Sequence, residues 1–233
     1  MSRLEIFPIE AIPEVRAGDD LAGLIATAEP DLHDGDVVVV TQKVVSKAED
    51  AMARIDPDDP RGHKALVEQE SVRIVRRRGD LIISETKHGF ICANAGIDLS
   101  NVDEGWAALL PEDSDRSARR IRDGIRAKLG VEVAVIISDT FGRPWRRGLT
   151  DVAIGCAGIQ AIVDLRGTED AKGRELQVTE VCVVDELAGA ADLVMGKAEG
   201  IAAAVIRGVD PDWLGRGEVR AEIVRPSQED LFR

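Results

Sequence analysis

The feature that most constrains this sequence is a short apolar run at residues 133–137, followed at once by Ser138, Asp139 and Thr140. The run is rich in β-branched residues and ends in turn-forming ones, so it predicts a buried β-strand. A carboxylate at the end of a buried strand is costly unless it is paired, hydrogen-bonded or bound to a metal ion. Asp139 is therefore a candidate functional residue.

Three arginines, Arg143, Arg146 and Arg147, follow Asp139 in a turn-rich segment. Arginine binds carboxylates and phosphates through paired hydrogen bonds. The arginines therefore either pair with Asp139 in an ion-pair network that closes a loop, or clamp an anionic substrate. The residue types alone leave both alternatives open, because structural ion-pair networks are common.

The rest of the chain predicts a mixture of strands and helices. Short β-branched runs predict strands, and apolar residues three and four apart predict helices that start at Asp or Ser and stop at Gly. The further strands are expected at residues 3–9, 37–40, 81–84, 90–93, 176–184 and 202–206. The helices are expected at residues 21–28, 65–78, 114–129 and 185–195.

Length and charge limit the class of protein. A chain of 233 residues forms one large domain or two small subdomains. A net charge of -13 and a pI near 4.8 argue against a nucleic-acid-binding protein, which would carry a basic face. Arginines that cluster locally in an acidic chain favour small anionic ligands. The sequence has no signal-peptide pattern and no run near the ~18 apolar residues that span a membrane, so we expect a cytoplasmic protein.

The three cysteines, Cys92, Cys156 and Cys182, each lie in an apolar context. Their odd number and the lack of a Cys-x-x-Cys pair argue against a disulfide framework and for a reducing compartment. The three histidines lie far apart, so the sequence offers no zinc site.

Two lysines, Lys43 and Lys47, follow the run of four valines at residues 37–40. If this segment is helical, lysines four apart share one face and offer a phosphate site. The glycine-rich P-loop pattern is absent. The alternative is two solvated lysines, which the spacing alone favours.

A loop at residues 94–101, NAGIDLSN, is rich in oxygen ligands. Asp98 and Asn101 are candidates for binding a hard cation, which takes carboxylate and carbonyl oxygens. Asp98 is equally able to fix the turn through a hydrogen bond to its own backbone.

Several motifs together resemble one known family over essentially the whole chain. They are RLEIFPIEAIPEVRAGDDL, DGDVVVVTQKVVSKAE, NAGIDLSNV, SDTFGRPWRRG, GRELQVTEVCVVDELA and MGKAEG, in that order. In this combination the sequence resembles the coenzyme F-420-0:L-glutamate ligase family (CofE), and also the N-terminal half of its two-domain actinobacterial homologue (FbiB). Residues 1–233 would then be one family domain, either a stand-alone ligase or the first domain of a longer protein.

The resemblance implies an α+β fold with mixed sheets and helices, arranged as two intertwined subdomains, in a homodimer. It implies a ligase that uses GTP and a divalent cation, Mg or Mn, to join L-glutamate to the deazaflavin coenzyme F-420-0 through an acyl phosphate. Further glutamates can then be added through γ-linkages. Such phosphoryl transfer between anions requires positive charge and in-line positioning.

The resemblance also implies the roles of individual residues. Asp98, Asp139 and Thr140 would carry the metal, and we count Asp98, Asp139 and Arg146 as catalytic. Our own addition is that Arg143, Arg146 and Arg147 hold the anionic groups of the substrates. The implied nucleotide-binding residues are Ile12, Pro13, Glu14, Val15, Gln42, Lys43, Lys47, Asn101, Met195 and Gly196.

One loop departs from the family pattern. Archaeal members carry a metal-binding acidic residue after Met-Gly, whereas here Lys197 stands at that place and Glu199 follows two residues later. Either Glu199 is the metal ligand, or the metal set is reduced and Lys197 contacts the nucleotide phosphate directly. Two other functions stay open on the residues alone: a metal-dependent nucleotide hydrolase and a non-catalytic module that binds the deazaflavin or a nucleotide.

Overall fold

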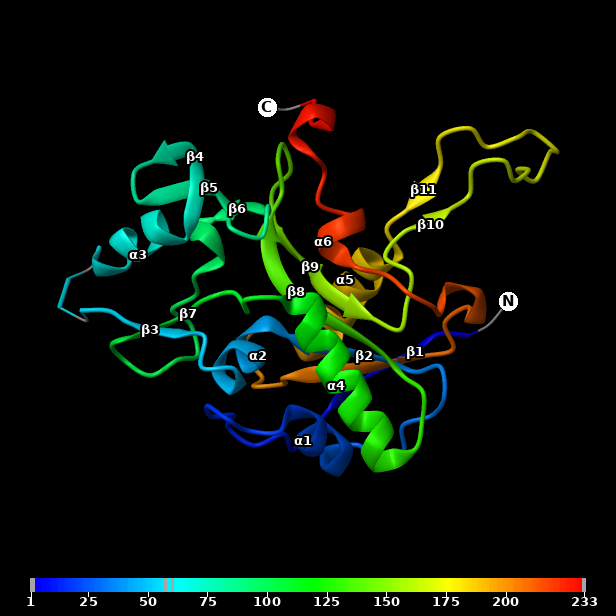
Figure 1. Ribbon diagram of the computed structural model, residues 1–233, viewed down its shortest axis with the longest axis horizontal. Helices are drawn as coiled ribbons and strands as arrows, with labels where there is room; N and C mark the ends of the chain where they lie inside the picture. The colour runs from blue at the N-terminus through cyan, green and yellow to red at the C-terminus, as the bar shows by residue number, and fades with distance from the viewer. Residues whose placement is uncertain (1–2, 57, 60, 232–233) are drawn as a thin grey trace.

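The computed structural model describes residues 3–56, 58–59 and 61–231. Its centre is a five-stranded sheet in the order β1–β12–β2–β8–β9 (Figure 1). Strands β2 and β8 are parallel, and the other neighbours in this sheet are antiparallel. The bounds are β1 (Glu5–Ile9), β2 (Val37–Thr41), β8 (Ala134–Gly142), β9 (Leu149–Ala157) and β12 (Ala203–Arg207).

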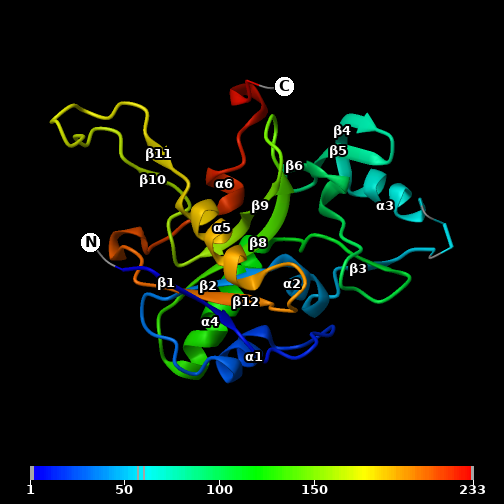
Figure 2. The ribbon, with the colours of Figure 1, turned by 180° about the vertical axis from the view of Figure 1, so that it is seen from behind.

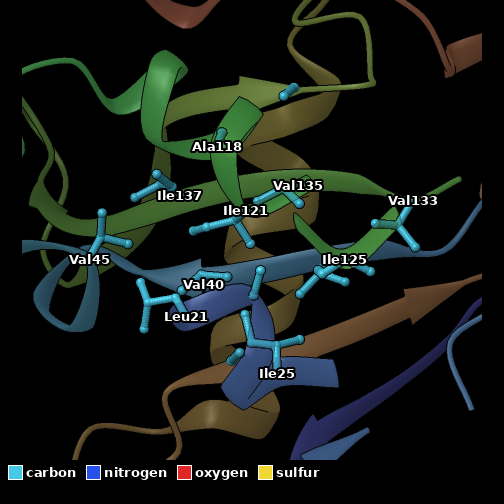
Figure 3. Close-up of a cluster of buried hydrophobic side chains, with 14 of the residues drawn as sticks. Leu21, Ile25, Val40, Val45, Ala118, Ile121, Ile125, Val133, Val135 and Ile137 are labelled. Atoms are coloured by element: carbon cyan, nitrogen blue, oxygen red, sulfur yellow. The ribbon is translucent and has the colours of Figure 1, made fainter. Parts of the chain in front are cut away.

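Helices cover both faces of this sheet (Figures 1 and 2). Helices α1 (Leu21–Ala28) and α4 (Ser114–Leu129) pack on one face, where Val38 and Val40 point (Figure 3). Helices α5 (Val183–Met195) and α6 (Val219–Glu222) pack on the other, where Val37 and Val39 point. A strand buried on both faces reads as a continuous apolar run, which explains the four valines.

Strand β9 contains a β-bulge beside the N-terminus of α4. Ile137 pairs with Gly155 and Ser138 pairs with Ala153, so Ile154 has no partner in this register. A Cβ atom on Gly155 would lie 2.3 Å from the backbone carbonyl carbon of Ser114. Glycine is therefore required where the helix meets the bulge, because any side chain would push α4 off the sheet.

A smaller layer is built from residues 52–108 and has its own apolar cluster, which includes Val67, Ile82 and Ala107. It follows α2 (Gln42–Ala48), whose Gln42 Nε2 donates a 2.7 Å hydrogen bond to the Leu109 carbonyl. Its elements are β3 (Met52–Arg54), α3 (Gly62–Glu70), β4 (Ser71–Arg78), β5 (Leu81–Thr86), β6 (Ile91–Ala93), η1 (Asn94–Gly96) and β7 (Trp106–Ala108).

A short arm, β10 (Val163–Asp164) and β11 (Glu180–Val181), extends away from the sheet (Figure 1). The chain ends in the turns η2 (Pro211–Trp213) and η3 (Ser227–Glu229) beside α6. Together these elements confirm the α+β fold class.

Two predicted elements are wrong. The helix expected at residues 65–78 ends at Glu70, and Ser71–Arg78 form β4, which pairs with β5. The segment SVRIVRRR contains three β-branched residues, and pairing with β5 decides for the strand. The strand expected at residues 176–184 is reduced to Glu180–Val181, because α5 begins at Val183 and buries Val183 and Val184 as part of a helix.

Candidate active site

A cavity of about 400 Å³ lies beyond the end of β2, where the chain leaves the sheet and enters α2. Ligands of sheets with parallel strands bind at such carboxyl ends. The cavity is lined by Thr41, Gln42, Lys43, Asp98, Ser100, Asn101, Ser138, Asp139, Thr140, Leu149, Asp151, Gly196, Lys197, Gly200 and Ile201. It therefore joins five stretches of the chain, at residues 41–43, 98–101, 138–140, 149–151 and 196–201.

Asp98 and Lys43 form one side of the cavity. Lys43 Nζ lies 2.9 Å from Asp98 Oδ2 and donates a hydrogen bond of 2.8 Å to Ser100 Oγ. The Ser100 N–H donates to Asp98 Oδ1 at 2.7 Å. Burial opposes ionisation of Asp98, but the hydrogen bonds from Ser100 and Lys43 outweigh it and hold its pKa below the ordinary value. Asp98 is therefore ionised. Its carboxylate fixes the turn through the Ser100 N–H and also lines the cavity.

Asp139 lacks a basic partner among the described residues. Its Oδ1 accepts one hydrogen bond, of 2.8 Å, from the Thr140 N–H. Burial, together with the negative charges of Asp98 and Asp151, raises the pKa of Asp139 to about 7. A carboxylate held in this way is stabilised by any cation that enters the cavity.

A second acid, Asp151, lies opposite Thr140 in the β8–β9 pair and is buried. Its carboxylate accepts hydrogen bonds from Ser138 Oγ at 3.1 Å and Thr140 Oγ1 at 2.6 Å, and pairs with Lys197 Nζ at 2.7 Å. Burial opposes charging of Lys197, but Asp151 and Asp192 outweigh it and raise the pKa of the ammonium.

The sequence analysis missed Asp151, although one signal for it exists. Strands that fold back around the turn at residues 143–148 place residue 151 opposite residue 140. This register could not be fixed from sequence, because the bulge at Ile154 and the turn length are both needed to define it.

The residues at the end of α5 and in the loop that follows it lie partly in the core and partly at the cavity. Met195 is buried in the apolar cluster beneath α5, so its side chain does not line the cavity. Gly196 and Lys197 do line it. Glu199 is exposed and lies outside the cavity lining, with its Cγ close to Gly196.

Some predicted nucleotide-binding residues lie around a neighbouring cavity of about 420 Å³ at the C-terminal end of α2. Glu14, Val15 and Lys47 line it, and Lys47 Nζ pairs with Glu14 Oε1 at 2.5 Å. Ile12 packs against the core and Pro13 is exposed. Lys43 and Lys47 are on one helix, as expected, and each enters a different cavity.

The three arginines lie at the exposed tip of the β8–β9 hairpin. Arg143 Nη2 donates a 2.9 Å hydrogen bond to the Arg147 carbonyl. Among the described residues Arg143, Arg146 and Arg147 form no ion pair with a carboxylate, so the alternative in which they pair with Asp139 is wrong. They lie outside the cavity lining, near Leu149.

The donor set limits where a metal ion could bind. No group of three or more His, Cys, Asp or Glu side chains within the described residues is arranged to hold one. Asp98, Asp139 and the Thr140 hydroxyl offer oxygen ligands of the kind that Mg²⁺ and Mn²⁺ prefer. A divalent cation that keeps several waters fits two carboxylates and a hydroxyl.

Comparison with known proteins gives the class. Residues 10–208 match the F420-0:Gamma-glutamyl ligase family. The chain belongs to this family, and it is a ligase. No helix in the described ranges has the length and apolar character needed to cross a membrane.

Relatives that match along nearly the whole chain support the same family. The coenzyme F420:L-glutamate ligase of Methanothermobacter thermautotrophicus is 44% identical over 99% of both chains. That of Methanopyrus kandleri is 45% identical and that of Methanocaldococcus jannaschii is 38% identical, each over 99% of this chain and 97% of the relative.

Proposed function

We propose that this ligase joins L-glutamate to coenzyme F420-0, using GTP and a divalent cation, Mg²⁺ or Mn²⁺. The relatives at 38% to 45% identity carry the name of a coenzyme F420:L-glutamate ligase, which supports the two substrates. The acyl-phosphate route and the later addition of γ-linked glutamates are part of the same proposal.

One observation carries the metal requirement. Lys43 is paired with Asp98 and Lys197 with Asp151, so the remaining carboxylate of the cavity, Asp139, has no lysine partner among the described residues. Burial first, and then the negative charges of Asp98 and Asp151, raise the pKa of Asp139 to about 7, which supports a cation beside it. In this proposal Asp98, Asp139 and Thr140 hold the divalent cation, which when bound neutralises phosphate charge during transfer.

The reaction has two steps. A carboxylate oxygen of F420-0 attacks the γ-phosphorus of GTP, the bond to the β-phosphate oxygen breaks, and GDP leaves. The glutamate nitrogen then attacks the acyl carbon, inorganic phosphate leaves, and the nitrogen loses a proton. Lys43 and Lys197 line the same cavity as Asp139 and would contact the phosphoryl oxygens.

The two cavities beside α2 suggest how a nucleotide lies. Lys47, Glu14 and Val15 face the second cavity, and Gln42, Lys43 and Asn101 face the first. A nucleotide that runs along α2 from one cavity to the other would contact both sets. Gln42 holds α2 in place through its bonds to Ser46 Oγ and the Leu109 carbonyl, so its contribution is to position the lysines.

The arginine tip supplies a separate part of the proposal, that Arg143, Arg146 and Arg147 bind substrate anions. Exposed arginines without carboxylate partners are available for a phosphodiester or a glutamate carboxylate. Arg146→Ala is expected to raise the KM for F420-0 or glutamate about tenfold. Unchanged KM values for both substrates would contradict this assignment.

The central test is a reaction of the purified chain with F420-0, L-glutamate, GTP and Mn²⁺, read by product mass. Masses that increase by whole glutamyl units, and only when GTP and metal are present, would support the proposal. GTP loss without glutamyl products would favour a nucleotide hydrolase. Omitting each component in turn, and replacing GTP by ATP, controls for the co-substrate.

Glu199→Gln tests the remaining metal ligand. Because Glu199 is exposed and outside the cavity lining, we expect no change in the Mn²⁺ concentration that gives half-maximal activity. We also propose that the chain acts as a cytoplasmic homodimer, and light scattering of the purified protein measures its mass in solution.

A further inference from the structure

The hydroxyl of Thr140 is held between two charged groups. It donates a hydrogen bond to Asp151 Oδ1 at 2.6 Å and accepts one from Lys197 Nζ at 2.7 Å. A threonine hydroxyl has one hydrogen to donate and two lone pairs to accept with. Both neighbours therefore fix its orientation, and one lone pair is left over.

Asp151 cannot reverse this arrangement. Its side chain is 3% exposed and also receives the Ser138 hydroxyl at 3.1 Å, so it acts as an acceptor toward Ser138, Thr140 and Lys197 together. An ionised carboxylate can only accept. The hydrogen of Thr140 must then point at Asp151, so it is not available to a ligand in the cavity that Thr140 lines.

Lys197 reaches Thr140 from an unusual stretch of backbone. Gly196, just before it, has φ 61° and ψ −177°, a region that is essentially limited to glycine. The Lys197 ammonium also pairs with Asp192 Oδ1 at 2.6 Å. The lysine thus approaches from the loop after α5 and occupies the other side of the hydroxyl.

We infer that Asp151 is a positioning residue, which fixes the Thr140 hydroxyl so that it presents only a lone pair to the cavity. Such a group accepts cations and N–H donors and cannot donate to a phosphate oxygen. This inference rests on the proposed function, in which Thr140 is a metal ligand. Asp151 would then be an outer partner, which does not bind the metal itself and orients the residue that does. Outer partners of this kind typically contribute 10–100-fold to metal affinity.

A purely structural role is the competing explanation, because the Asp151–Lys197 ion pair also fastens the loop after α5 to the sheet. Asp192 offers the matched control. It pairs with the same ammonium, carries the same charge and has no hydrogen bond to Thr140 among the described residues. The two explanations differ in what each asparagine variant does to the cation.

The experiment measures Mn²⁺ binding to the nucleotide-free full chain by titration calorimetry and by electron paramagnetic resonance. Asp151→Asn, whose amide can donate to Thr140 and turn its hydroxyl, is expected to weaken Mn²⁺ binding 10- to 100-fold. Asp192→Asn is expected to change it less than threefold. In a Thr140→Val background, Asp151→Asn is expected to have no further effect beyond twofold.

Three results would overturn the inference: equal losses for the two asparagine variants, a full Asp151→Asn loss that persists without the Thr140 hydroxyl, or a wild-type chain that binds no Mn²⁺. If Asp151→Asn does not fold, Thr140→Ser and Thr140→Val decide. Serine should keep Mn²⁺ affinity within threefold and valine should lose it 10- to 100-fold, and equal affinities would overturn the inference. Glutamyl product formed by the wild type tests the proposed function separately.

Discussion

Two aspartates, one in β8 and one in a helix packed against β9, show how differently the same side chain is used in two regions of this molecule. Asp115, in the first turn of α4, is buried and accepts hydrogen bonds from the backbone N–H groups of Cys156, Val219 and Arg220 at 2.8, 3.0 and 3.1 Å. Asp139 receives one N–H and lies near other carboxylates. A carboxylate whose oxygens accept several backbone N–H hydrogen bonds links elements of the fold. A carboxylate with few hydrogen-bond donors around it is available to a ligand.

Asp139→Asn should have the largest effect. The substitution removes the Asp139 carboxylate, which has no basic partner among the described residues. We therefore expect glutamate-dependent turnover to fall about 10³-fold or more. The melting temperature in EDTA should not fall, because no native ion pair is lost. Steady-state kinetics and thermal melting measure the two. A variant that keeps a tenth of wild-type turnover would show that Asp139 does not hold the metal.

Asp115→Ala should act on stability instead. It leaves buried N–H groups without acceptors, so the free energy of unfolding should drop by about 3–5 kcal/mol. Urea denaturation measures the change, and turnover per folded molecule should stay near the wild-type value. Asp123→Ala, on the same helix, removes an exposed carboxylate that pairs with Arg122 and Arg126, and should cost less than about 1 kcal/mol. Equal costs for the two variants would break the comparison.

The pH dependence of stability sharpens the contrast. The pKa of Asp139 is raised to about 7 in the folded chain, so between about pH 4 and pH 7 the folded state binds more protons than the unfolded state. In EDTA, Asp139 should therefore lower the free energy of unfolding as the pH rises through this range, by about 2–4 kcal/mol. Asp139→Asn should remove this slope and be the more stable protein at pH 8. Denaturation curves of the two proteins that run parallel in pH would argue against the shift.

Gly155→Ala should have the smallest effect of the four. The new methyl group would clash with the backbone of Ser114 at the start of α4, beside Asp115. Overpacking of this kind costs about 1–3 kcal/mol. Gly142→Ala, in β8, meets no atom within 4 Å and should change the free energy of unfolding by less than about 0.5 kcal/mol. If both substitutions cost the same, the close approach of α4 is not what requires glycine.

Sequence periodicity located the core of the sheet because burial on both faces produces uninterrupted apolar runs. It failed at β4, because arginines interrupt the apolar alternation there and the strand depends on pairing with β5. It also failed at residues 176–184, because apolar residues at a helix start resemble a strand end.

The candidate site was predictable in part. Asp139 is conspicuous because it ends a buried run, and Asp98 because it lies in a loop of small polar residues. Asp151 is not, since its place beside Thr140 follows from the hairpin register, which the turn alone does not fix. The separation of Lys43 from Lys47 into two cavities also depends on how α2 packs, which residue spacing does not determine.

The end of β2 has a consequence for the size of the site. Thr41 pairs with Ser138 as the last step of the parallel ladder, so from Asp139 onward β8 has an open edge on that side. Asp139 and Thr140 lie beyond this last pair, and both line the cavity although successive residues of a strand point to opposite faces. Strand length is therefore the dimension that sets this cavity: a β2 longer by two residues would occupy it with backbone, and a shorter one would enlarge it without changing the core beneath.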